Sequence, residues 1–201
     1  MISALIDNFL RPIKLAFIMQ IIKQLVEISL RKRQPQDLAY NLQAAILLAM
    51  SVVFLRYTSF ISLSSLSNPL GYSLVSVIGE SLVIYALLRS QNKTGRFVQT
   101  ITALFGVTVI ATIASVIMSV TVVLQLALPV LMIWSIYLMV LILRAALECS
   151  IIASLMLTIG YNAIGYMLVI LLFPKFQSEM LAEWELIKAA IETAQLEAQS
   201  R

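Results

Sequence analysis

The chain is dominated by long, continuous runs of apolar residues that are separated by short polar connections. Each run reaches the roughly 20 residues that an α-helix needs to cross a bilayer. Windows of about 19 residues place five such spans, at residues 38–56, 69–89, 97–119, 122–144 and 149–173. Because the runs are continuous and do not alternate with polar residues, they predict helices and disfavour the strands of a membrane β-barrel.

The first 34 residues show a weaker and more polar pattern. Polar residues recur there at steps of three to four, at Gln20, Lys23, Gln24, Glu27 and Arg31, and so follow one face of a helix. This pattern predicts an amphipathic helix that lies in the membrane interface over residues 1–34. An alternative is a sixth span, because residues 15–22 are apolar.

Beyond Pro174 the apolar runs give way to the pattern of an amphipathic helix. Apolar positions recur at alternating steps of four and three residues, which is the heptad spacing of a helix that packs against another helix. The seam begins with Met180, Trp184, Ile187 and Ile191. Glutamates occupy much of the remaining surface and disfavour adhesion to anionic lipid. Residues 175–201 are therefore predicted to form an acidic helix that binds a partner subunit.

Composition supports the same class of protein. Hydrophobic residues make up 61% of the 201 residues and charged residues only 12%, which excludes an ordinary soluble domain. The predicted fold is an all-α, polytopic membrane bundle of about five helices over residues 35–174, with an amphipathic helix at each end of the chain. Membrane lipids are thus expected partners, together with other membrane-protein subunits or further copies of the chain.

Lysines and arginines are distributed unevenly between the two sides that five spans define. With the N-terminus inside, ten of the fourteen lie on the inner side, as the positive-inside rule requires. Arg31, Lys32 and Arg33 form the densest cluster and are predicted to anchor the chain to lipid headgroups. The cluster has no interleaved aromatic residues, so it does not indicate nucleic-acid binding. The distribution predicts a cytoplasmic N-terminus and a C-terminus on the opposite side.

Few residues are suited to catalysis or metal binding. The chain has no histidine and a single cysteine, Cys149, which removes the commonest general base and leaves no thiolate metal cluster. No glycine-rich segment matches a nucleotide-binding loop. The sequence therefore predicts neither an enzyme nor a protein with a metal or cofactor.

Glu80 is the most informative polar residue, because it lies near the middle of the second predicted span. A carboxyl at that depth is costly and marks either a proton or cation pathway or a structural lock between helices. The structural interpretation is favoured, since no other acidic residue lies deep in a span. The residues predicted to form an intramembrane polar site are Glu80, Thr112, Gln125, Thr158 and Asn162.

Three short motifs carry a resemblance to a known group of proteins. They are QPQDLAY at residues 34–40, GRFVQTITALFG at residues 95–106 and LRAALE at residues 143–148. With them the chain resembles a family of uncharacterised small inner-membrane proteins of proteobacteria and, more loosely, Yip1-domain proteins. The resemblance implies a location in the bacterial inner membrane, and it implies no catalytic residues. The acidic C-terminal helix departs from that family, whose members end soon after a motif like Leu172-Phe173-Pro174.

Two functions follow from these patterns. The first is a non-catalytic accessory or scaffold subunit of a bacterial inner-membrane complex, which the helical C-terminal seam favours. The second is a small proton- or ion-coupled transporter in which Glu80 lines the path. The transporter is disfavoured because the chain has no detectable internal repeat, and because an odd number of spans fits an inverted repeat poorly.

Overall fold

The computed structural model describes residues 23–24, 27–28, 38, 40–61, 66–119 and 122–199, and this part of the chain contains helices but no strands. Five of its helices are long and apolar enough to cross a membrane: α3 (Leu42–Ile61), α4 (Pro69–Ser90), α5 (Phe97–Met118), α7 (Leu128–Leu147) and α8 (Ile151–Leu172). The predicted all-α bundle with five spans is confirmed. Such an arrangement is that of a multi-pass membrane protein.

Polar residues at the helix starts explain where three of these spans begin. The side chain of Asn41 accepts a hydrogen bond from the Ala44 amide at 2.9 Å, and Asn68 accepts one from Gly71 at 3.0 Å. Ser150 accepts from Ala153 at 3.2 Å at the start of α8. Each contact satisfies an amide that has no partner within its own helix.

Two spans lie at different positions from those expected. The first was predicted at residues 38–56 and is found at Leu42–Ile61, so that Arg56 lies inside the helix and not at its end. The fourth was predicted to start at residue 122, but Val122–Gln125 form a separate short helix, α6, and α7 starts at Leu128. Pro129 lies in the first turn of α7, where its missing amide is tolerated, and therefore starts the helix without kinking it.

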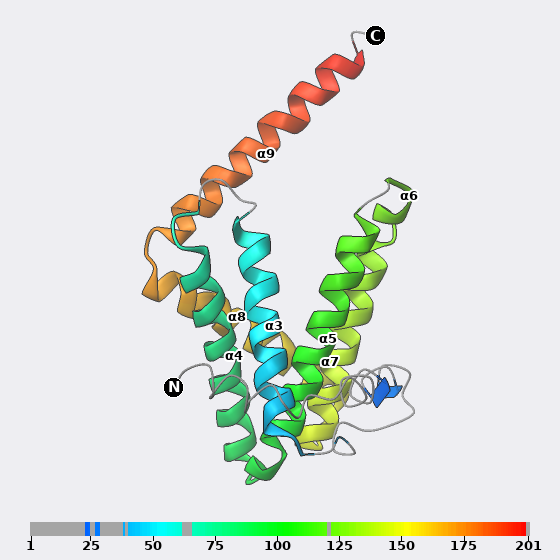
Figure 1. Ribbon diagram of the computed structural model, residues 1–201, viewed down its shortest axis with the longest axis vertical. Helices are drawn as coiled ribbons and strands as arrows, with labels where there is room; N and C mark the ends of the chain where they lie inside the picture. The colour runs from blue at the N-terminus through cyan, green and yellow to red at the C-terminus, as the bar shows by residue number, and fades with distance from the viewer. Residues whose placement is uncertain are drawn as a thin grey trace, which may run out of the picture.

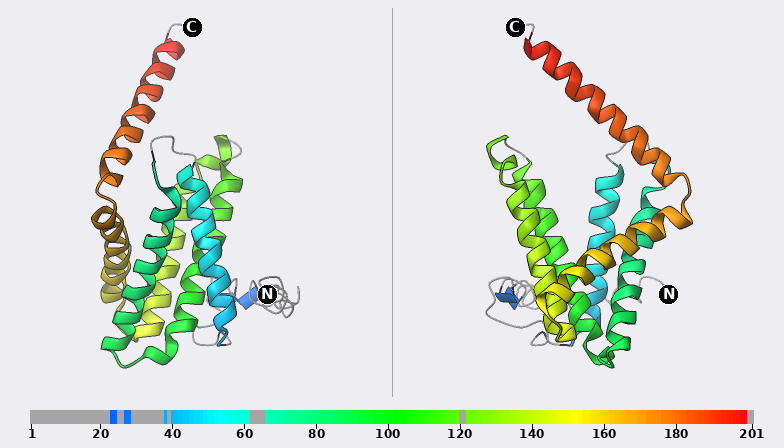
Figure 2. Two further views of the ribbon diagram at one scale, coloured as in Figure 1. Left: turned by 60° about the vertical axis from the view of Figure 1, so that its left-hand side comes forward. Right: turned by 180° about the vertical axis from the view of Figure 1, so that it is seen from behind.

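The five long helices form a ring in which each packs against two neighbours, in the order α3, α4, α8, α7 and α5. A short 3-10 helix, η2 (Thr94–Arg96), joins α4 to α5. Helix α8 lies behind the others in the view of Figure 1, and the right-hand view of Figure 2, from behind, shows it crossing them obliquely. Helices α5 and α7 diverge from α3 and α4 towards the α6 end (Figure 1). Between α3 and α5, where these helices diverge, lies an apolar groove of about 450 Å³. Its lining includes Met50, Phe54 and Val109.

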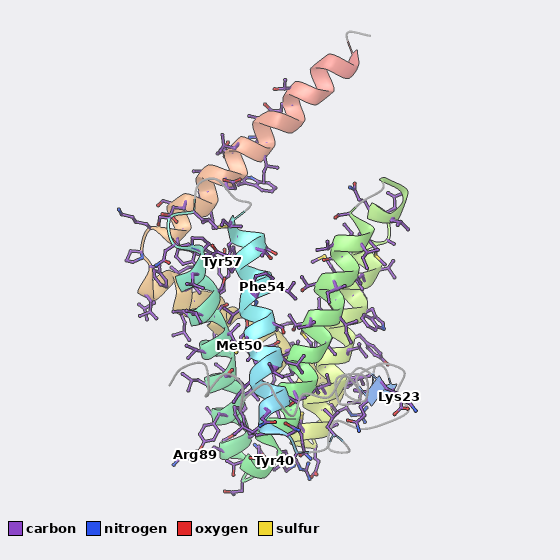
Figure 3. All side chains as sticks on the ribbon, viewed as in Figure 1. Lys23, Tyr40, Met50, Phe54, Tyr57 and Arg89 are labelled. Atoms are coloured by element: carbon purple, nitrogen blue, oxygen red, sulfur yellow. The ribbon has the colours of Figure 1, made fainter. Side chains whose placement is uncertain are left out.

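The main core lies at the opposite end, which we call the basic end because Arg89, Lys93, Arg96 and Arg144 lie there. Figure 3 shows Arg89 and Tyr40 at this end, with Met50, Phe54 and Tyr57 following one another along α3 away from it. The first half of α5 is almost continuously buried, from Val98 to Val107. The large side chains on the outer faces are exposed and apolar, as expected for surfaces that face lipid.

Most of the predicted interfacial helix and the predicted lipid anchor, Arg31, Lys32 and Arg33, lie outside the described residues. Lys23, Gln24, Glu27 and Ile28 are helical, and Ile28 belongs to the main core. Leu38 is also buried in that core, and its carbonyl accepts a hydrogen bond from Gln99 at 2.9 Å. The segment before α3 is thus tied to α5 near the basic end.

Candidate functional site

An ion pair between Arg56 of α3 and Glu80 of α4 lies within the apolar helices. The Arg56 guanidinium donates two hydrogen bonds to the carboxylate, from Nη1 to Oε1 at 2.8 Å and from Nη2 to Oε2 at 3.1 Å. Nη1 also donates to the Ser76 hydroxyl at 2.8 Å. Because two parallel hydrogen bonds require the guanidinium and the carboxylate to share a plane, the pair sets the rotation of α3 against α4.

Burial makes the two charges dependent on each other. The Glu80 side chain keeps 7% of its exposure and the Arg56 side chain 26%. Removing a charge from water is costly, and an opposite charge at hydrogen-bonding distance offsets that cost. Loss of either partner would leave the other charge unpaired in apolar surroundings. Removal of either side chain alone is therefore expected to destabilise the contact between α3 and α4.

Helix α8 closes the other side of the carboxylate through Gly165. A Cβ atom at Gly165 would lie 3.1 Å from Glu80 Cγ and 3.4 Å from Oε1. In the same contact, a Cβ atom at Gly79 would lie 2.7 Å from Leu168 Cδ1. The absence of side chains at both glycines lets α4 and α8 approach closely, as small residues do between membrane helices. Glu80 is therefore held between α3 and α8.

The polar side chains along α8 differ in their burial. Ser154 and Thr158 are buried, and so is Tyr161 one turn further on, whereas Asn162 is exposed. The Tyr161 hydroxyl donates to the sulfur of Met139 at 3.5 Å. The buried residues of α8 thus follow one helix face, from Ser154 through Thr158 and Tyr161 to Gly165.

The structure pairs Glu80 with none of the other four residues of the predicted polar site. Three of them bond to a carbonyl one turn earlier in their own helix: Thr112 to Thr108, Thr158 to Ser154 and Asn162 to Thr158, each at 2.8 Å. Such local bonds satisfy a polar side chain without a second helix. Gln125 lies in α6 and not in a span, and it donates to the Ser119 carbonyl at 3.0 Å.

Sequence reasoning missed Arg56 as the partner of Glu80. It placed this arginine at the end of the first span, where a basic residue is an ordinary topology signal. The overlooked signal was the apolar pair Phe60 and Ile61, which extends the hydrophobic run beyond Arg56. A span that includes these residues buries an arginine, and a buried arginine requires an anionic partner.

The C-terminal helix α9 (Phe176–Gln199) is attached to the bundle at its first turn. The Tyr72 hydroxyl donates to Glu179 Oε2 at 2.6 Å, and the Ser67 amide donates to the same oxygen at 3.2 Å. Burial acts to raise the pKa of Glu179, but these hydrogen bonds outweigh it and hold that pKa below its usual value. Phe176 is buried beneath them, with its ring 4.6 Å from that of Tyr72 between centroids.

Beyond this attachment α9 projects away from the bundle (Figure 1). Met180 packs partly against the small core around Tyr72 and Phe176. Further along, Trp184 is 62% exposed and Ile187 is 42% exposed. The predicted helix is present, and among the residues that the structure describes its seam packs against the bundle at Met180; the side chain of Ile191 lies outside the described residues.

Glu148 organises the basic end. On a continuous helix Glu148 would lie one turn after Arg144 and could pair with it, but α7 ends at Leu147 and Glu148 has a left-handed backbone with φ 55°, so this helical spacing is lost. The carboxylate instead pairs with Lys93 at 2.8 Å and Arg96 at 2.7 Å. Hydrogen bonds from these two cations lower the pKa of Glu148.

The same two cations close the end of α7. Lys93 donates to the Leu147 carbonyl at 2.8 Å, and Arg96 donates to that of Ala146 at 3.2 Å. Both carbonyls belong to the last turn of the helix, where they have no amide partner and where the helix dipole favours positive charge. The connection between α4 and α5 is thereby clamped to the end of α7.

The described residues hold no group of three or more His, Cys, Asp or Glu side chains that is able to bind a metal ion. Cys149 is half-buried and reduced at the start of α8. The ion pairs Arg56–Glu80 and Lys93–Glu148 each join two segments of the bundle.

No family model, curated protein or solved structure matches this chain. The resemblance to small proteobacterial inner-membrane proteins therefore stays a prediction from three short motifs.

Proposed function

We propose that this chain is a non-catalytic accessory or scaffold subunit of a bacterial inner-membrane protein complex. The observation that carries the proposal is the face of α9, which leaves the bundle with Leu181, Trp184 and Ile187 exposed. Its glutamates make adhesion to anionic lipid unfavourable, because like charges repel at the membrane surface. A helix with an apolar seam and an acidic remainder is suited to binding another helix.

The bundle itself supports a structural role for Glu80. A residue in a proton or ion path must exchange its ligand, but Glu80 is held by two hydrogen bonds from Arg56 and packed against Gly165. Pathways also use several ionisable groups in sequence, and Glu80 is the only acidic residue of the five spans. These contacts favour a lock between three helices over a transport site.

In the proposed orientation the basic end faces the cytoplasm and α9 lies on the periplasmic side. Arg89, Lys93, Arg96 and Arg144 lie at that end, in agreement with the positive-inside rule. Gln91 and Ser178 are exposed at opposite ends, so each is a position for a single cysteine after Cys149→Ser. A membrane-impermeant maleimide applied to intact spheroplasts is expected to label Ser178→Cys and to spare Gln91→Cys. The reverse pattern would invert the orientation.

The test of the function is native mass spectrometry of the tagged protein after extraction from its own membrane in a mild detergent. The proposal expects stoichiometric foreign subunits with the wild-type chain, and their loss from a Trp184→Glu variant. Ala189→Glu places the same charge on an exposed position outside the seam and is expected to retain them. Absence of foreign subunits from the wild-type protein would refute the scaffold function and lead to a flux assay.

A further inference from the structure

The seam of α9 has a heptad register that defines which residues face a partner. Met180, which packs against the bundle, and Ile187 take the d positions, and Trp184 and Ile191 take the a positions. Glu183 then lies at g and Lys188 at e, on the two flanks of the seam. In a coiled coil the g and e residues of one helix lie beside those of its partner and determine partner choice and orientation.

Membrane insertion restricts the direction of any self-association. Copies of one chain inserted with the same orientation are related by a rotation axis along the membrane normal. Two such α9 helices, each attached to its bundle through Tyr72 and Glu179, leave the membrane in the same direction. A pair of α9 helices must therefore be parallel.

The flanking charges fit a parallel pair of identical helices. In a parallel coiled coil a g residue faces the e residue five positions later on the partner, and Lys188 is five positions after Glu183. Each of the two symmetric contacts would thus join opposite charges. In an antiparallel pair g faces g and e faces e, so Glu183 and Lys188 would not face each other. The charge pattern selects the same parallel arrangement that the membrane imposes.

We infer that the partner of α9 is the α9 helix of a second copy of this chain, in a parallel, in-register coiled coil closed by Glu183 and Lys188. The inference rests on the proposed scaffold function: self-pairing of α9 would assemble the scaffold as a dimer, and foreign subunits would bind that dimer, so a Trp184→Glu change that breaks the pairing would also release them. Three heptads form a marginal coiled coil in isolation. Here the bundles restrict both helices to one membrane, which raises their effective concentration.

Disulfide cross-linking of the full-length protein in its native membrane tests the contact. In a Cys149→Ser background, Ile187→Cys places a thiol in the seam, and Ala189→Cys places one at the outward f position of the same turn. With copper phenanthroline as oxidant, the Ile187→Cys protein is expected to form a covalent dimer on the order of tenfold faster than the Ala189→Cys protein. Equal rates, or no dimer at position 187, would overturn the inference.

Charge exchange provides a second test. Glu183→Lys alone and Lys188→Glu alone each oppose like charges in both symmetric contacts, and each is expected to lower the cross-linking rate at position 187 on the order of fivefold. The double exchange restores opposite charges and is expected to restore the rate. A double variant no better than the single ones would refute the assigned register.

The two proposals fail in different ways. Cross-links from position 187 to a foreign subunit, without a homodimer, would remove the self-pairing and leave the scaffold function in place. A homodimer together with an absence of foreign subunits in native mass spectrometry would retain the coiled coil and remove the scaffold function.

Discussion

Replacement of Glu80 by glutamine tests the ion pair directly. Glutamine keeps the shape of the side chain and so fits against Gly165, but it leaves the Arg56 guanidinium without a counter-charge. Removing one partner of a fully buried pair costs about 3–5 kcal/mol. Because Arg56 keeps 26% of its side-chain exposure, we expect a smaller loss of unfolding free energy, about 2–4 kcal/mol.

A double-mutant cycle separates the pair from its surroundings. Arg56→Met removes the other charge, and the double variant with Glu80→Gln removes both without leaving an unpaired ion. The double variant is expected to lose less stability than the sum of the two single changes, with a coupling energy of at least about 1.5 kcal/mol.

The assay is reversible unfolding in mixed micelles of a mild detergent and sodium dodecyl sulfate, followed by circular dichroism. Ser81→Ala is the matched control, because its hydroxyl bonds only to the Val77 carbonyl of its own helix, and it is expected to be neutral. The reasoning is refuted if Glu80→Gln costs less than about 0.5 kcal/mol, or if the two single changes add within that margin.

Further predictions concern the packing of α8 and the attachment of α9. Gly165→Ala is expected to lower the free energy of unfolding by about 1–3 kcal/mol in the same assay, because its Cβ would meet the side chain of Glu80. Gly160→Ala is the control, because a Cβ there lies in open space on the same helix. It is expected to be neutral or to stabilise the protein by up to about 1 kcal/mol. Tyr72→Phe removes the 2.6 Å hydrogen bond to Glu179 and is expected to broaden the distance distribution between spin labels on α4 and α9; Tyr166→Phe should leave it unchanged. The pKa of Glu179 is below its ordinary value when α9 is docked. The ionised carboxylate therefore stabilises docking fully at a pH above the ordinary pKa of a glutamate, and this stabilisation is lost as the pH falls through the lowered pKa of Glu179. Label distances that are constant down to that range would contradict this assignment.

The ion pair changes how the polar residues of the bundle are interpreted. Thr112 and Thr158 were expected to form a polar site with Glu80, yet each donates its hydroxyl to a carbonyl one turn earlier in its own helix. The Glu80 carboxylate is instead paired with Arg56. This arginine lies inside a span because α3 extends to Ile61. Glu148, between α7 and α8, likewise pairs with residues that are distant in the sequence. Its left-handed backbone turns the side chain away from Arg144 and towards Lys93 and Arg96, which lie between α4 and α5.

The sequence by itself determined the class of fold, since a bilayer admits continuous apolar runs only as helices, and the five spans and the C-terminal helix were read from hydropathy and heptad spacing. Tertiary structure alone decided which helices are neighbours and which charges meet. Helix partners within a membrane are chosen by close packing at glycines such as Gly79 and Gly165 and by the pairing of Arg56 with Glu80. Lipid tails are as apolar as the helix surfaces, so hydropathy places a span in the membrane but carries no information about what it packs against.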